Sequence, residues 1–183
     1  EAIDLKLHPE EGRKLSFLEK MFADEPGTLH VAFIHDKTPE QSGWTYGHEL
    51  GRQHVEKVFE GKIETKSYEH AMGAPEEVIE HAIKEGNQII FTTSPKLFNA
   101  SLSAAVKHPD KLILNCSLNK SHRYIRTYYA RMYEAKFIIG AIAGTLTEND
   151  KVGYLCDYPI YGQIAGINAF ALGVQMVNPR AKV

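Results

Sequence analysis

The chain has 183 residues, of which 43% are hydrophobic and 24% charged, the composition of a globular protein rather than of a disordered or fibrous one. Lys and Arg number 21 against 23 Asp and Glu, and the net charge of −2 excludes the basic field that nucleic-acid binding needs. No run approaches the roughly 18 apolar residues of a membrane-spanning helix.

The first predicted element is an amphipathic helix over residues 10–24, where apolar side chains recur at helical spacing: Leu15, Leu18, Met21 and Phe22. A regular alternation of strands and helices begins at residue 29. Strands are predicted at 29–36, 62–70, 88–94 and 111–117, and helices at 42–59, 75–86 and 97–109. This alternation predicts an α/β fold in three layers, a parallel sheet covered on both faces.

Local signals mark the ends of these helices. Ser42 is expected to cap the N-terminus of the helix at 42–59. The buried side of that helix is predicted from its apolar residues, which are Leu50, Val55, Val58 and Phe59. Pro75 suits the first turn of the next helix, and Gly86 its C-terminal stop.

The pattern changes after residue 117. Residues 119–133 are polar, basic and rich in tyrosine, and a crossing between two lobes is predicted near 118–130. A helix at 134–147, a strand at 151–157 and a helix at 162–177 follow, with Gly140 and Gly144 favouring close packing against a sheet. The predicted domains are a helical extension at 1–28, a first α/β lobe at 29–120, and the crossing with a partial second lobe at 121–183. The sequence ends as another strand begins, so an incomplete second lobe is expected.

Motifs of catalysis and metal binding are missing from the sequence. It has no Walker A, GxGxxG or GxSxG pattern. "HELGR" begins like the zinc motif HExxH but has Arg52 where the second histidine belongs, and His48 and His54 fall on different faces of a helix. Cys116 and Cys156 each end an apolar run and are expected to be buried thiols, which hints at a reducing compartment. No metal and no cofactor is predicted.

Polar residues gather where the predicted strands end, which is where open α/β sheets bind ligands. The first strand leads into a loop with Asp36, and the third is followed by Thr92, Thr93 and Ser94. Hydroxyls and aromatics without a nucleophile or base are typical of a binding cleft. Capping of the strand end is the alternative for the three hydroxyl residues.

Four segments taken together resemble the basic membrane protein family of substrate-binding proteins, which contains purine base and nucleoside receptors of ABC transporters. These segments are "SGWTYGHELGR", "GNQIIFTTS", "RMYEAKFIIGAIAGTLT" and "KVGYLCDYPIYGQIAGINAFALGVQMVNPRAKV". The resemblance covers about residues 29–183. It implies a type I periplasmic-binding-protein fold, with ligand held between two α/β lobes, of which the second is cut short here.

The resemblance also implies roles for single residues. Trp44 matches the aromatic that packs flat on a purine, residues 92–94 match the first-lobe loop that lines the cleft, and Tyr158 matches the second-lobe turn that faces it. Relatives carry an acidic residue where this chain has Gln41, so a charged hydrogen-bond acceptor is lost. Asp36 or Glu40 is the candidate substitute.

The function that this resemblance implies is the solute-binding component of an ABC transporter, non-enzymatic, with a purine base or nucleoside as ligand and a permease as partner. A lipid-anchored, extracytoplasmic location goes with it. The alternative is a ligand-sensing regulatory domain attached to a larger, intracellular protein. An enzyme acting on a purine is the rival from another class and would need a carboxylate cluster or metal site. Self-association through the apolar surface of the incomplete lobe is expected.

Overall fold

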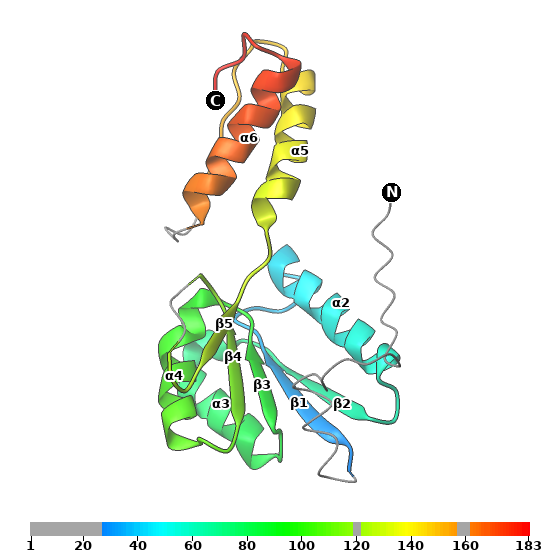
Figure 1. The fold of residues 1–183 in the computed structure, drawn as a ribbon, viewed down its shortest axis with the longest axis vertical. Helices are drawn as coiled ribbons and strands as arrows, with labels where there is room; N and C mark the ends of the chain where they lie inside the picture. Colours follow the sequence, from blue (N-terminus) through cyan, green and yellow to red (C-terminus); the bar gives the residue numbers. More distant parts are fainter. Residues whose placement is uncertain (1–26, 119–121, 157–161) are drawn as a thin grey trace, which may run out of the picture.

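The computed structural model describes residues 27–118, 122–156 and 162–183 (Figure 1). Within these ranges five parallel strands form one sheet in the order β2-β1-β3-β4-β5. The strands are β1 (Leu29–Ile34), β2 (Ile63–Tyr68), β3 (Ile89–Thr92), β4 (Leu112–Cys116) and β5 (Arg126–Tyr128). The helices are α2 (Gly43–Val58), α3 (Pro75–Lys84), α4 (Phe98–Lys107), α5 (Met132–Leu146) and α6 (Gln163–Val177). The α/β fold and the parallel sheet predicted from the alternation are confirmed.

The helix ends follow the predicted signals. Ser42 caps α2, because its hydroxyl accepts a hydrogen bond from the amide of Thr45 at 3.3 Å. Pro75 opens α3, and Gly86 follows that helix with a φ of 94°, a left-handed conformation that glycine adopts without strain.

Helices cover both faces of the sheet (Figure 1). Helices α3 and α4 pack on one face, where the apolar core includes Ile34, Ile90 and Ile113. Helix α2 packs on the other face, against Val31 and Phe33. The sheet with these helices places the carboxyl ends of β1, β3 and β4 along one edge.

The inner face of α2 differs from the prediction. Leu50 and Val58 are 48% and 51% exposed, whereas Thr45 is fully buried. Val55 and Phe59 do pack on the core, as expected. The face of α2 that meets the sheet is therefore polar toward its N-terminus and apolar toward its C-terminus.

Two strands differ from the sequence-based expectation. Residues 126–128, placed in the lobe crossing, form β5 and pair with β4. The run from 151 to 156, predicted as a strand, makes a single bridge between Lys151 and Lys182. A strand exists only where a neighbour satisfies its backbone groups, and within the described residues this run has that one pairing.

Helices α5 and α6 pack side by side and run in the same direction, as a pair that stands apart from the sheet (Figure 1). The close approach of the two helices depends on glycine. A Cβ on Gly140 would lie 2.1 Å from the carbonyl oxygen of Phe170, and a Cβ on Gly173 would lie 2.0 Å from the carbonyl oxygen of Phe137. The glycines at 140 and 144 thus pack against a helix, whereas packing against a sheet was predicted. Small residues let two helix backbones approach to this extent.

Much apolar surface on this helix pair is exposed. The large exposed hydrophobic side chains of α5 and α6 are Met132, Tyr133, Ile138, Ile139, Ile142, Leu146, Ile164, Leu172, Met176 and Val177. Among the helices of the described ranges, none combines the length and the hydropathy that a membrane span requires.

Candidate ligand-binding site

Trp44 marks the candidate site at the carboxyl edge of the sheet. It lies in the first turn of α2, and its indole is half-buried. The indole Nε1–H donates to the backbone carbonyl of Thr93, directly after β3, at 2.6 Å. The carbonyl of Trp44 accepts from His48 Nδ1 at 2.9 Å, one turn further along the helix. The ring edge is therefore fixed to the end of β3 while its backbone is braced within α2.

Thr93 joins the ends of β1 and β3. Its hydroxyl donates to the carbonyl of Ile34 at 3.1 Å and lies 2.9 Å from Nδ1 of His35. Because the hydroxyl proton is directed to Ile34, Nδ1 of His35 is the donor in the second bond. The other ring nitrogen, Nε2, is then an acceptor, and it is buried without a hydrogen-bond partner in the described structure.

His35 is fully buried between the sheet and α2. Burial lowers the pKa of His35 from 6.5 to about 4, and the nearby Glu49 carboxylate, 3.8 Å from Nε2, opposes this only in part. Burial disfavours the imidazolium because a charge loses its hydration in the interior. His35 is accordingly a neutral hydrogen-bonding residue at neutral pH.

Glu49 is held in turn by Arg52 on α2. Arg52 Nε donates to both carboxylate oxygens of Glu49 at 2.9 Å, and this hydrogen bonding lowers the pKa of Glu49. Arg52 also reaches Glu56 and the hydroxyl of Thr65 on β2. The polar part of α2 is thus fastened to the sheet by an ion-pair network.

The residues after β3 bond inward. Thr92 is fully buried, and its hydroxyl lies 2.8 Å from both Ser101 Oγ and Asn115 Nδ2. Ser94 Oγ accepts from the amide of Lys96 at 3.4 Å, which is the capping that the sequence left as an alternative. Asn115 also donates to the Ser94 carbonyl at 2.9 Å, and its Oδ1 has no hydrogen-bond partner in the described residues.

The other predicted site residues lie around this edge or outside the described ranges. Asp36 follows β1 and is half-buried. Gln41 is exposed in the loop before α2, and its backbone N–H donates to the Thr38 carbonyl at 3.2 Å. Tyr158 lies outside the described residues. Trp44, Thr93 and the loop with Asp36 therefore meet at one edge, as the pattern of strand ends predicted.

Three residues at this edge were not singled out from the sequence. His35 directly precedes Asp36 at the end of the same apolar run. This position is the signal from which the sequence could have identified His35. Asn115 is the last residue but one of β4, and a polar residue is unusual inside an otherwise apolar strand. Tyr129 was assigned to the lobe crossing, but its ring centroid lies 5.8 Å from that of Trp44, with an angle of 31° between the planes.

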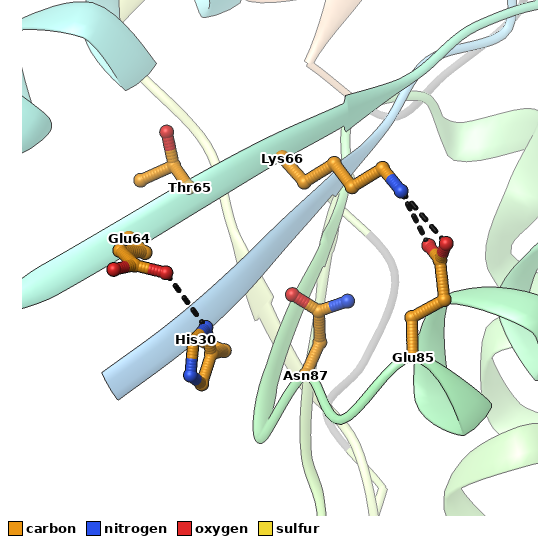
Figure 2. Close-up of a pocket in the computed structure, with 6 residues that line it drawn as sticks. All are labelled: His30, Glu64, Thr65, Lys66, Glu85 and Asn87. Atoms are coloured by element: carbon orange, nitrogen blue, oxygen red, sulfur yellow. Dashed lines mark hydrogen bonds and ion pairs between the residues drawn. The ribbon is translucent and has the colours of Figure 1, made fainter. Parts of the chain in front are cut away.

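Two cavities lie near the sheet, and neither contains Trp44. One, of about 390 Å³, is lined by residues from the amino-terminal halves of β1 and β2 and from the end of α3, and it carries two ion pairs, His30–Glu64 and Lys66–Glu85 (Figure 2). The other, of about 490 Å³, lies beside the start of α2 and is lined in part by Tyr46, Glu49 and Ser67.

The chemistry of the edge favours binding over catalysis. His35 and Thr93 resemble a base–hydroxyl pair, but both are fully buried and the imidazole is a weak base. Cys116 is buried too, and burial raises its pKa to about 11, so it is no thiolate nucleophile at neutral pH. Across residues 27–118, 122–156 and 162–183, His, Cys, Asp and Glu side chains form no group that could hold a metal ion. Cys156 is exposed, so the prediction that both thiols are buried was wrong for one of them.

Comparisons with known proteins agree with this geometry. A purine-binding protein of Brucella abortus (strain 2308) is 34% identical over 157 residues, which cover 85% of this chain and 45% of that protein. A Haloferax volcanii protein named for glucose binding in an ABC transporter is 27% identical over 158 residues, covering 86% of this chain and 40% of that protein. This chain therefore spans less than half the length of these two relatives.

The fold is shared with solved structures of the same class. A solute-binding protein of an ABC transporter system from Conexibacter woesei superposes with a TM-score of 0.64 at 16% identity, covering 85% of this chain and 53% of that one. Such a likeness shows the type I periplasmic-binding-protein fold. The model of the family described as "ABC transporter substrate-binding protein PnrA-like" matches residues 28–183, and the chain belongs to this family.

Proposed function

We propose that this chain supplies the first lobe and part of the second lobe of a solute-binding protein of an ABC transporter, with a purine base or nucleoside as ligand. The observation that carries the proposal is the placement of Trp44, a half-buried indole anchored by its own N–H at the carboxyl edge of the sheet. Stacking of a base on an aromatic ring contributes about 1–3 kcal/mol in proteins that bind single-stranded nucleic acids. The similarity to the Brucella abortus purine-binding protein supports the same ligand class.

The residues around Trp44 divide into two groups in this proposal. Thr92, Thr93 and Ser94 are buried and bonded internally, so they hold the edge in shape beneath the ligand. Gln41 and Asp36, in the loop after β1, are accessible and supply polar contacts to the purine edge. Tyr158 closes the site from the second lobe, as the family resemblance implies.

The proposed boundary between the lobes falls at residues 129–131. β5 ends at Tyr128 within the first sheet, and α5 begins at Met132 in the separate helix pair. Closure of the two lobes around ligand at such a crossing would present the closed form to a permease, as in hinge-closing binding proteins.

The test is a titration of the gene product that carries this chain. Trp44 is the single tryptophan of the 183 residues, and the difference in emission between the parent and Trp44→Phe isolates its signal. Adenine, guanine and their nucleosides are expected to quench that emission saturably, with glucose as the control ligand. Calorimetry repeats the measurement without relying on fluorescence. Absence of saturable binding for every purine, or saturable binding of glucose alone, would refute the purine assignment.

Location and partner are proposed on the same basis. We propose an extracytoplasmic protein, lipid-anchored and paired with an ABC permease. Cell fractionation with an epitope tag distinguishes this from a cytoplasmic sensor, and co-purification with a membrane permease is expected only for the transport role. Recovery of the protein in the cytosol, without a permease, would favour a regulatory sensor.

A further inference from the structure

The segment between the sheet and the α5–α6 pair contacts the proposed ligand platform. Tyr129 directly follows β5 and lies three residues before the start of α5. Its ring centroid is 5.8 Å from that of Trp44, and the two planes are inclined by 31°. This distance and angle are those of an attractive aromatic pair.

Trp44 has limited freedom on its other sides. Its Nε1–H is bonded to the Thr93 carbonyl, and the ring of His48 lies 5.1 Å away at an angle of 54°. Both contacts come from residues of the first lobe. The contact with Tyr129 is the one that comes from the crossing segment.

Tyr128, the residue before, is fastened to the sheet. Its ring packs edge-on against Phe91 of β3 at 5.7 Å, and its strand pairing places it opposite Cys116 of β4. Tyr128 therefore ties the start of the crossing segment to the sheet, and Tyr129 is the first residue after that attachment.

We propose that Tyr129 is a positioning residue that fixes the orientation of the Trp44 indole and couples this orientation to the geometry of the crossing between the lobes. Ligand stacked on Trp44 then favours the crossing geometry in which Tyr129 supports the indole, and that geometry in turn favours ligand. This inference rests on the proposed role of Trp44 as the ligand platform, but the contact itself can be measured without ligand.

The experiment compares Tyr129→Ala, Tyr129→Leu and Tyr129→Phe with the parent in the gene product that carries this chain. Tyr124→Ala is the matched control, because Tyr124 is an exposed tyrosine whose ring contacts His122 instead of Trp44. The first readout is ligand-free emission of Trp44 and its quenching by acrylamide. The second is purine affinity by calorimetry, and far-ultraviolet circular dichroism reports whether each variant is folded.

The Ala and Leu variants are expected to shift Trp44 emission to longer wavelength and to raise acrylamide quenching, because the indole loses its aromatic cover. Purine affinity is expected to fall by about 3- to 10-fold, the range that an aromatic pair contributes. Tyr129→Phe is expected to keep the emission, the quenching and the purine affinity of the parent, and Tyr124→Ala is expected to change none of them. The Leu variant retains apolar bulk, so it keeps the test valid where Ala perturbs folding.

Three outcomes would overturn the inference. Unchanged emission and quenching in folded Ala and Leu variants show that Tyr129 does not hold the indole. Altered emission with unchanged purine affinity shows that the contact does not position ligand. A Phe variant that behaves like Ala assigns the effect to the hydroxyl group. If the parent itself binds no purine, the proposed function fails, and the ligand-free readout still decides whether Tyr129 positions Trp44.

Discussion

The neutral, buried imidazole of His35 is expected to make the fold sensitive to mild acid. Burial lowers its pKa from 6.5 in the unfolded chain to about 4 in the folded protein. Between these values the unfolded chain binds a proton that the folded protein does not bind. The free energy of unfolding therefore decreases as pH falls through this window, and is unaffected by His35 above it.

The size of the effect follows from the two pKa values. Lowering the pH from about 7.5 to about 4.5 is expected to remove about 2.5 kcal/mol of stability through His35 alone. Below about pH 4 both states bind the proton, so this loss stops growing. Glu49, the carboxylate nearest to Nε2, keeps its charge through most of the window because hydrogen bonds from Arg52 lower its pKa.

The assay is urea unfolding across this pH range for the parent and for His35→Asn. Asparagine places a polar atom near the position of Nδ1, where it can still bond Thr93, but it does not titrate. The difference between the two stabilities cancels the acidic groups common to both proteins and should change by about 2.5 kcal/mol. His70→Asn is the control, because His70 is exposed and its φ of 56° suits asparagine. A pH-independent difference between parent and His35→Asn would refute the reasoning.

Three further predictions concern the packing and the thiols. Gly173→Val should separate α6 from α5, because its Cβ would meet the Phe137 carbonyl, and helicity and the free energy of unfolding should both fall. Asn115→Asp should cost about 2–4 kcal/mol in denaturant unfolding, because it faces a buried carboxylate toward the Ser94 carbonyl oxygen. At neutral pH an aromatic disulfide reagent should label exposed Cys156 quickly and Cys116 only after unfolding, because Cys116 is buried with its pKa raised to about 11.

Each of these predictions has a control or a refuting outcome. Gly47→Val is the packing control, since no atom lies within 4 Å of a Cβ at this exposed position of α2. Asn115→Asp with unchanged stability would mean that its Nδ2 hydrogen bonds contribute little. Two thiols labelled at equal rates in the folded protein would contradict the burial of Cys116.

Periodicity and strand-end chemistry were sufficient to predict most of the sheet. Strands β1, β3 and β4 are apolar runs, β2 alternates between apolar and polar residues, and helices with recognisable end signals separate the four; each of these signals is local. The short strand β5 was missed because "RTY" has no apolar pattern, and its pairing with β4 depends on the path of the chain across the sheet. The strand predicted at 151–157 is the opposite case. Its sequence is typical of a strand, but a strand also needs a neighbouring strand to pair with.

The sequence did not predict that the buried face of α2 is polar near its N-terminus. Apolar residues were assigned to its buried face, yet Thr45 is buried and Leu50 is exposed. The helix faces the polar carboxyl edge at its start, where His35 and the Arg52 network need polar neighbours. Trp44 could be placed at that edge from its position after a strand, whereas its hydrogen bond to Thr93 required the relative placement of β1, β3 and α2.

The separation of the α5–α6 pair from the sheet has a consequence for local stability. Because the two helices pack chiefly on each other, their opening need not disturb the five strands, and the helix pair and the sheet can exchange their amide hydrogens on different timescales. Amides of β1 and β3 are expected to exchange at the rate of global unfolding, and amides of α5 and α6 much faster. Ligand that contacts both the sheet and the helix pair would slow the amides of α5 and α6 selectively, so hydrogen exchange could locate a binding event even where no chromophore reports it.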